Sequence, residues 1–234
     1  GFEILPRYWI SGSDIQDTAD QIYWDHDWVF SFRNVTDTTT DVRTAIGTIG
    51  PFVPYGNSAP VLTFSGPAPS KSALLFTSIF NSIPFDFLVR QSMGGVNLNL
   101  YILKQLPMPS PEHLHELELH YRGDTTSAAG FLKQRSLELS WTSHALDSFG
   151  EEVSDRTAPY TWDPERRRRL TVEIDAAVAS LYSIDRSDYE YMFSTFDILR
   201  DREKDEFGEF KFKQECLEAF DEITTGYAFE RLGE

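Results

Sequence analysis

Residues 28–64 read WVFSFRNVTDTTTDVRTAIGTIGPFVPYGNSAPVLTF, and this segment decides the fold class. Three short stretches in it combine aromatic with β-branched residues, at 28–32, 44–49 and 61–64, and we expect each of them to be a strand. Glycine, proline and asparagine separate the stretches, which is typical of turns. The segment therefore predicts a small β platform.

Helical spacing appears on the C-terminal side of this platform. Apolar residues recur at intervals of three and four over residues 72–83, and Pro84 is expected to open a second short helix over 84–93. The next stretch, 96–103, alternates at first and then becomes apolar, so we predict a further strand there.

The proline-rich segment LPMPSP, residues 106–111, is the best internal boundary in the sequence. It predicts two domains, a β-rich domain at 1–107 and a helical domain at 108–234. Asp163 before Pro164 marks a helix start, and Ser187 with Glu190 suggests a capping box. Further helices are expected at 112–121, 129–149 and 209–223. The expected fold class is α+β, a small mixed β platform with helices followed by a mainly helical C-terminal part.

The composition predicts a folded but acidic protein. The 234 residues are 41% hydrophobic and carry a net charge of −16. The first 107 residues hold six basic and nine acidic residues, so most of the acidity belongs to the second half. Proteins that bind nucleic acid usually present basic surface, because neutralised phosphates supply much of the affinity. The charge therefore argues against DNA binding by the chain as a whole and leaves the nearly neutral first half open to it.

The sequence contains no signal for secretion or for a membrane. Cys216 is the single cysteine, so there is no intrachain disulfide framework. No apolar run approaches the roughly 18–20 residues of a membrane helix. The first residues, GFEILPRYWI, lack the pattern of a signal peptide. We therefore expect a cytoplasmic protein without a membrane partner.

The common catalytic motifs are absent. There is no phosphate-binding loop of the Walker type, no GxGxxG and no GxSxG. The histidines in HLHELELH, residues 113–120, are poorly spaced for one metal ion, and solvated helix positions are the simpler interpretation. His26, between two aspartates, is most simply a surface loop residue. We predict no catalytic residue and no metal site.

A run of four arginines at 166–169 allows two interpretations. It occupies the first turn of its expected helix, where positive charge opposes the helix dipole, and this cost suggests an acidic or nucleic-acid partner. The simpler interpretation is that Asp163, Glu165 and Glu173 neutralise the run locally.

Two polar segments have side chains suited to reading DNA. Residues 33–44, RNVTDTTTDVRT, combine arginine and asparagine, which pair with guanine and adenine edges, with threonine, which offers both a hydroxyl and a methyl group. Residues 93–99, MGGVNLN, contain two glycines that allow close backbone approach, and two asparagines that project to one side if the piece is extended. Either segment alone is weak support for function.

Taken in order, these segments resemble the target-recognition region of type IIG restriction–modification methylases and of related methyltransferases of phage-defence systems. The resemblance covers most of residues 28–223. It is carried by a series of short motifs: Arg43-Thr44, Gly56-Asn57-Ser58, Asn81-Ser82, Asp86 with Arg90, Gly94-Gly95, and Leu106-Pro107-Met108-Pro109. The stretch RRRRLTVEIDAAVASLYSIDRSDYEYMFSTF is similar to the helical tail that follows in the same proteins.

The catalytic motifs of that family are missing here. No Pro-Pro pair occurs, so the motif that holds the target adenine is absent, as is the glycine-rich S-adenosylmethionine motif. The resemblance implies a non-catalytic specificity fragment that needs no cofactor itself. The parent would use S-adenosylmethionine to methylate an adenine flipped out of the duplex, and could also cleave DNA. The implied partners are double-stranded DNA and the N-terminal methyltransferase domain of the parent.

We predict nine DNA-binding residues within this region. Arg33, Asn34, Thr36, Arg43, Thr44, Asn97 and Asn99 are expected to face bases, and Arg90 and Lys104 are expected on phosphates. Two simpler interpretations remain open: Arg90 pairs with Asp86 one helical turn earlier, and Asn57-Ser58 is only a turn. The alternative function is a protein-interaction module that docks on a methyltransferase core or a partner subunit. A hydrolase with an undetected site is a third reading.

Overall fold

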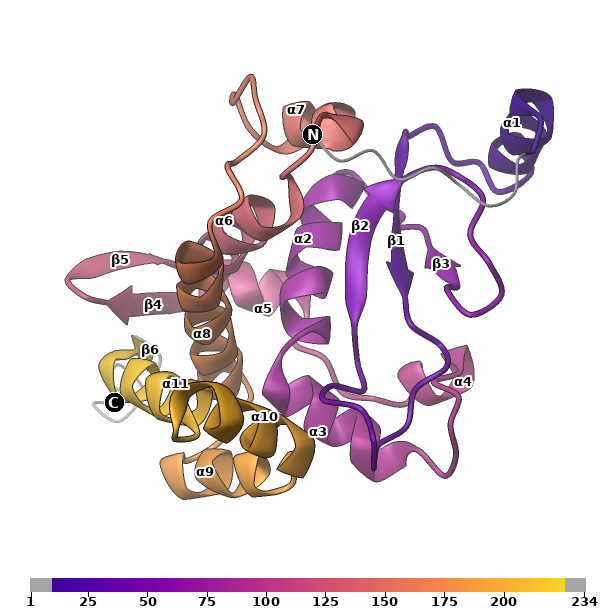
Figure 1. The fold of residues 1–234 in the computed structure, drawn as a ribbon. Helices are drawn as coiled ribbons and strands as arrows, with labels where there is room; N and C mark the ends of the chain where they lie inside the picture. Colours follow the sequence, from indigo (N-terminus) through magenta and orange to yellow (C-terminus); the bar gives the residue numbers. More distant parts are fainter. Residues whose placement is uncertain (1–9, 226–234) are drawn as a thin grey trace.

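The computed structural model describes residues 10–225, which form two small antiparallel sheets and a set of helices, with the β4–β5 hairpin at one edge (Figure 1). The first sheet has the strand order β2-β1-β3 and the second the order β5-β4-β6. Their strands are β1 (Trp28–Phe32), β2 (Gly47–Pro51), β3 (Val61–Leu62), β4 (Glu118–Tyr121), β5 (Asp124–Ser127) and β6 (Thr224–Thr225). The predicted α+β class is confirmed, with antiparallel pairing in both sheets.

The centre of the first sheet is β1, all five residues of which are buried. Phe30 pairs with Ile49 of β2 and Leu62 of β3. Its ring meets Phe76 and Phe80 of helix α2 (Pro69–Phe80) at centroid distances of 5.0 and 5.2 Å. Phe30 and Phe80 are fully buried, and a fully buried aromatic side chain stabilises the fold by roughly 1.5–3 kcal/mol. This aromatic layer fixes α2 on one face of the sheet.

Helix α3 (Ile83–Ser92) follows α2 directly and turns away from it by 71°. Ser82 begins it, because the Ser82 side chain accepts a hydrogen bond from the Phe85 amide at 3.3 Å. Between residues 10 and 225 no single helix is long and apolar enough to cross a membrane. The bent pair of helices α2 and α3 together has the length and composition of a membrane span, by those two criteria only. Most residues of α2 and half of those of α3 are buried in the core.

The second half is built around helix α8 (Pro164–Leu181), which packs against α6 (Ala128–Ser140) and α11 (Lys211–Glu222). The predicted start of α8 is confirmed, since the Asp163 carboxylate accepts from the Arg166 amide at 3.1 Å. The remaining helices are α1 (Gly12–Gln21), α4 (Leu100–Leu103), α5 (Pro111–Glu116), the 3-10 helix η1 (His144–Leu146), α7 (Asp147–Val153), α9 (Arg186–Ser194) and α10 (Asp197–Phe207).

One hydrophobic cluster runs through both predicted domains, because α2 packs against α6 and α8. The two halves therefore share a core, and the boundary after residue 107 stays a prediction.

Several predicted elements differ from the structure. Residues 96–103 are not a strand, since only Asn97 makes a bridge, to Val35, and Leu100–Leu103 is the short helix α4. The helix predicted at 112–121 ends at Glu116 and continues as β4. The helix predicted at 129–149 is broken after Ser140. Asp185, rather than Ser187, caps the helix that follows it.

Candidate nucleic-acid interface

Arg43 and Asp86 form the centre of a buried ion-pair network. The Arg43 Nε donates to the Asp86 carboxylate at 2.7 Å, and Nη2 donates to the Asn81 carbonyl at 2.6 Å. The Asp86 side chain is fully buried and also accepts from the Thr44 amide at 2.9 Å. The segment before β2 is thereby attached to the first turn of α3.

Arg90 completes this network from the next turn of α3. Its Nε donates to Asp86 at 3.2 Å, and its terminal nitrogens donate to backbone carbonyls, including those of Thr38 and Val42. The guanidinium also lies 4.1 Å from the ring centroid of Phe196 in the helical half. Only 8% of the Arg90 side chain is exposed, so Arg90 links segments inside the fold and is not a surface cation.

Asn81 links the end of α2 to β2. Its amide group donates to the Gly47 carbonyl at 2.9 Å, and its side-chain oxygen accepts from the Gly47 amide at 2.9 Å. We call Arg43, Thr44, Asn81, Asp86 and Arg90 the Arg43–Asp86 network. Asn81-Ser82, Arg43-Thr44 and the Asp86–Arg90 pair are three of the motifs behind the family resemblance, so these motifs meet at one place in the fold.

The helical half also reaches this network. Asp175 of α8 accepts a hydrogen bond from the Ile83 amide at the start of α3. Complete burial raises the Asp175 pKa to about 7, against the lowering effect of nearby Arg43. Although burial acts to lower it, the pKa of Arg43 is raised, because Asp86 and Asp175 are close. Sequence reasoning missed Asp175, whose only local signal is an acidic residue within the apolar stretch IDAAVA.

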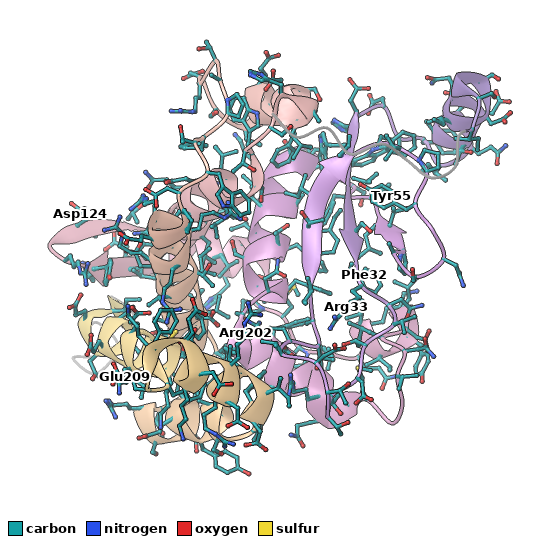
Figure 2. All side chains as sticks on the ribbon, in the orientation of Figure 1. Phe32, Arg33, Tyr55, Asp124, Arg202 and Glu209 are labelled. Carbon is teal, nitrogen blue, oxygen red and sulfur yellow. The ribbon has the colours of Figure 1, made fainter. Side chains whose placement is uncertain are left out.

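The polar segment 33–44 folds back on itself. The Arg33 guanidinium donates to the Thr36 hydroxyl at 2.7 Å and lies 3.0 Å from the Asp41 carboxylate. Asp41 accepts from the Asp37 amide at 2.8 Å, and that hydrogen bond is the main reason that its pKa is lowered. Thr39 and Thr40 are left exposed at the end of the loop. Figure 2 shows Arg33 at the end of β1, next to Phe32.

Asn34 joins two other loops through its backbone. Its amide donates to the Ser58 carbonyl at 2.9 Å, and its carbonyl accepts from the Leu98 amide at 2.8 Å. Its side-chain oxygen is buried and has no hydrogen-bond partner in the described chain. Asn57 and Ser58 form the expected turn, closed by a hydrogen bond from the Ala59 amide to the Gly56 carbonyl at 2.9 Å.

Residues 96–97 lie beside residues 35–36, where the loop at 37–40 begins. The Thr36 amide donates to the Val96 carbonyl at 2.9 Å, next to the bridge between Val35 and Asn97. An added side chain at Gly94 or Gly95 would meet no atom within 4 Å, so open space surrounds both glycines. We call residues 37–40 and 93–97 the loop pair. Asn97, Asn99 and Lys104 are all exposed, and Lys104 makes no ion pair with any residue between 10 and 225.

The structure therefore divides the nine predicted DNA-binding residues. Thr36 and Thr44 are buried, and the guanidinium groups of Arg43 and Arg90 are saturated by internal partners. In this conformation these four side chains cannot reach a base edge or a phosphate, so their predicted direct contacts are corrected to a structural role. Arg33 is likewise engaged by Asp41, and Asn34 is half-buried. Asn97, Asn99 and Lys104 remain available.

The arginine run at 166–169 is mostly neutralised, although not by the residues expected. Arg166 pairs with Glu138 at 2.8 Å, and Arg168 pairs with Glu203 at 2.8 Å and Glu215 at 2.6 Å. Arg167 donates to the Leu139 carbonyl at 2.8 Å. These contacts hold α8 to its neighbours, which favours the local interpretation over a phosphate patch.

An open groove of about 720 Å³ lies beside β3, lined by α1, the loop before β3 and the start of α4. Asn34, Asn57 and Asn99 line it together with apolar and aromatic side chains. Tyr55, labelled in Figure 2, is one of the aromatic residues. Sequence reasoning missed the groove, because its walls come from segments far apart in the chain.

Residues 10–225 contain no cluster of three or more histidine, cysteine or acidic residues that could hold a metal ion. His26 contacts Glu152 at 2.9 Å. Cys216 is buried, and burial raises its pKa well above the ordinary value, which disfavours a thiolate nucleophile. No known family model, no curated protein and no solved structure matches this chain.

Proposed function

We propose that this chain is a non-catalytic DNA sequence-recognition module of a bacterial DNA adenine methyltransferase or restriction–modification enzyme. One observation carries the proposal. Residues of three of the motifs form the Arg43–Asp86 network, whose Arg90 donates to the Thr38 carbonyl, and the bridge between Val35 and Asn97 joins the start of the loop at 37–40 to the segment with the exposed Asn97. Polar loops on a rigid scaffold are the usual construction of a recognition surface.

The loop pair supplies the side chains that the proposal needs. Asn97 offers an amide that matches the adenine edge, and Thr39 and Thr40 offer hydroxyl and methyl groups. Lys104 is the cation we assign to a phosphate. The loop pair replaces Arg43, Thr36 and Thr44 as the base-reading set.

Because the chain is acidic, we expect most of the DNA-binding affinity to come from another part of the parent. Arg33, Arg43 and Arg90 of the first half are engaged internally, so few phosphate contacts come from this module. The parent's methyltransferase domain, with S-adenosylmethionine, would supply the backbone contacts and the chemistry in the cytoplasm. We therefore expect this chain alone to bind duplex DNA weakly, with affinity that falls as salt rises.

Selection of duplexes from a random library by the purified chain tests the proposal. At low salt, the wild-type chain should enrich a short sequence, and Asn97→Ala should lose preference at one or two positions of it. Lys204→Ala, on the exposed face of α10, is the control and should enrich the same sequence. Failure of the wild-type chain to enrich any sequence, in conditions where it does bind DNA, counts against the proposal.

The acidic second half favours a second candidate, a protein-interaction module that docks on the methyltransferase core or a partner subunit. Residues 108–234 hold fifteen basic and twenty-eight acidic residues. Such a surface repels phosphates and attracts a basic protein. If the chain is a protein-interaction module, the duplex selection yields no sequence preference, and the chain co-purifies with the methyltransferase core.

A further inference from the structure

The groove beside β3 concentrates exposed apolar side chains. Six large apolar residues with 38–63% of their surface exposed line this one hollow. They are Ile10, Ile22, Val53, Val61, Leu100 and Tyr101. Exposed apolar residues scattered singly are ordinary, whereas a contiguous patch in a hollow marks an interaction site.

The walls of the groove come from three parts of the fold. Helix α1 and helix α4 lie on the β3 side of the first sheet, near its two ends (Figure 1). The loop at 52–60 lies between them and is held by the hydrogen bond from the Tyr55 hydroxyl to the Pro51 carbonyl at 3.0 Å. The Asn34 backbone attaches this loop to the segment that leads into α4. The hollow is thus bounded on one side by fixed backbone.

The charge of the groove has one sign. Asp14 is the single charged residue among those that line it. Asp14 belongs to α1, which also carries Asp17 and Asp20 and has no lysine or arginine. The Asp14 carboxylate disfavours a phosphate at this wall, and therefore disfavours nucleic acid as the occupant. It favours an occupant with basic residues next to an apolar face.

The amides along the groove suit a polypeptide. Asn34, Asn57 and Asn99 lie among the apolar side chains, and the exposed Asn57 and Asn99 offer donors and acceptors there. A hydrophobic floor with a few hydrogen-bonding groups is the usual anatomy of a protein interface. An amphipathic helix inserts side chains at positions i, i+3, i+4 and i+7 into such a groove.

We infer that this groove docks an amphipathic helix of a partner polypeptide. The helix places aliphatic side chains into the hollow and a lysine or arginine residue beside Asp14. The inference is independent of whether the loop pair reads DNA, since no residue of the loop pair lines the groove.

Fluorescence anisotropy with two model peptides tests the inference. Each probe is a labelled amphipathic helix of about 18 residues, long enough to fold, built from leucine with either lysine or glutamate. The full chain should bind the leucine–lysine peptide and not the leucine–glutamate peptide. Leu100→Ser with Tyr101→Ser should raise the Kd for the lysine peptide at least about tenfold, which is about 1.4 kcal/mol.

Matched variants separate docking from general attraction to an acidic protein. Asp14→Lys should weaken the lysine peptide about tenfold and permit binding of the glutamate peptide. Asp205→Lys, on α10, makes the same change in net charge and should alter neither peptide by more than about twofold. Tyr191→Ser, an equally exposed aromatic residue on α9, is the control for Tyr101.

Three results would overturn the inference. One is equal binding by wild type and the Leu100–Tyr101 variant. Another is an equal change in the Kd for the lysine peptide in Asp14→Lys and Asp205→Lys, which would mean that net charge alone attracts the peptide. The third is a groove variant that binds the peptide as the wild type does but loses another activity of the wild type. Loss of DNA binding would assign the groove to nucleic acid, and loss of self-association would assign it to a second copy of the chain.

Discussion

The guanidinium of Arg43 lies 2.7 Å from the carboxylate of Asp86, and both side chains belong to motifs by which the sequence resembles a DNA-recognition region. The pair is enclosed by the core, with Asp86 fully buried. Motif residues of types suited to contact a ligand here hold the backbone instead. Arg90, which shares Asp86, also donates to the Thr38 carbonyl and so holds the loop at 37–40, in which Thr39 and Thr40 are exposed.

Removal of one partner of this pair should destabilise the fold severely. Arg43→Met leaves the Asp86 charge buried with less compensation, and the expected loss is about 3–5 kcal/mol in the free energy of unfolding. Urea denaturation followed by circular dichroism measures it. Arg122→Met, which breaks an exposed pair with Glu222, is the control and should cost less than about 1 kcal/mol. Similar losses in both variants contradict the structural role of Arg43.

Stability should fall with rising pH because of Asp175. Its pKa in the folded protein is about 7, above the ordinary value of 3.8, so the folded state retains a proton that the unfolded state has lost. The contribution of this group is complete below pH about 4 and is lost as pH rises to about 7, at up to about 1.4 kcal/mol per pH unit. The titratable groups near Asp175 are Arg43, Asp86, Cys216 and Tyr189.

Urea midpoints at pH 5, 6, 7 and 8 measure this dependence. Asp175→Asn keeps an acceptor for the Ile83 amide and removes the titration. The difference in stability between wild type and the variant should therefore shrink or reverse between pH 5 and 7 and stay constant above pH about 7.5. A difference that does not change with pH contradicts the raised pKa.

Gly47 should tolerate no side chain. A Cβ atom there would overlap the ring of Phe30, which is fully buried between the sheet and α2. Overpacking of this kind costs about 1–3 kcal/mol, so Gly47→Ala should lower the thermal midpoint. Gly94→Ala, where open space surrounds the position, should change stability by less than about 0.5 kcal/mol. If Gly47→Ala is as stable as Gly94→Ala, the packing of Phe30 against β2 is wrong.

Lys104 should contribute to DNA affinity through charge alone. It is exposed and makes no ion pair with the rest of residues 10–225, so Lys104→Ala should leave stability unchanged. It should reduce the slope of log K against log salt for duplex binding by about one, equally for all sequences. Titrations at four salt concentrations measure the slope. A slope equal to that of the wild type removes Lys104 from the interface.

Local patterns predicted the elements that depend on neighbours in the sequence. The strand at Trp28–Phe32 and the helix start at Asp163 were both predictable, because aromatic composition and an aspartate before a proline act locally. Residues 96–103 were misread as a strand because a short apolar run has no decisive period, and here it forms a turn of helix, α4. At Glu118–Tyr121 the two-residue alternation of Leu117, Leu119 and Tyr121 is a strand signal, which the helical reading of the histidines overrode.

The site was less predictable than the fold. The sequence singled out the segments that meet in the structure, but it could not tell which side chains point inward. Asp86 lies forty-three residues from Arg43, and Asp175 lies ninety-two residues from Ile83. Only tertiary packing brings these partners together and converts expected DNA contacts into internal ones.

The sequence methylated by the full-length parent enzyme tests the central claim most directly. Genomic adenine methylation is to be mapped in cells that carry the wild-type gene, an Asn97→Asp variant or an Asp205→Ala control. The account predicts that Asn97→Asp changes or relaxes the methylated sequence at one or two positions, while the control keeps the wild-type sequence. An Asn97→Asp enzyme that is stably folded and methylates the unaltered sequence would contradict the claim that the loop pair reads DNA.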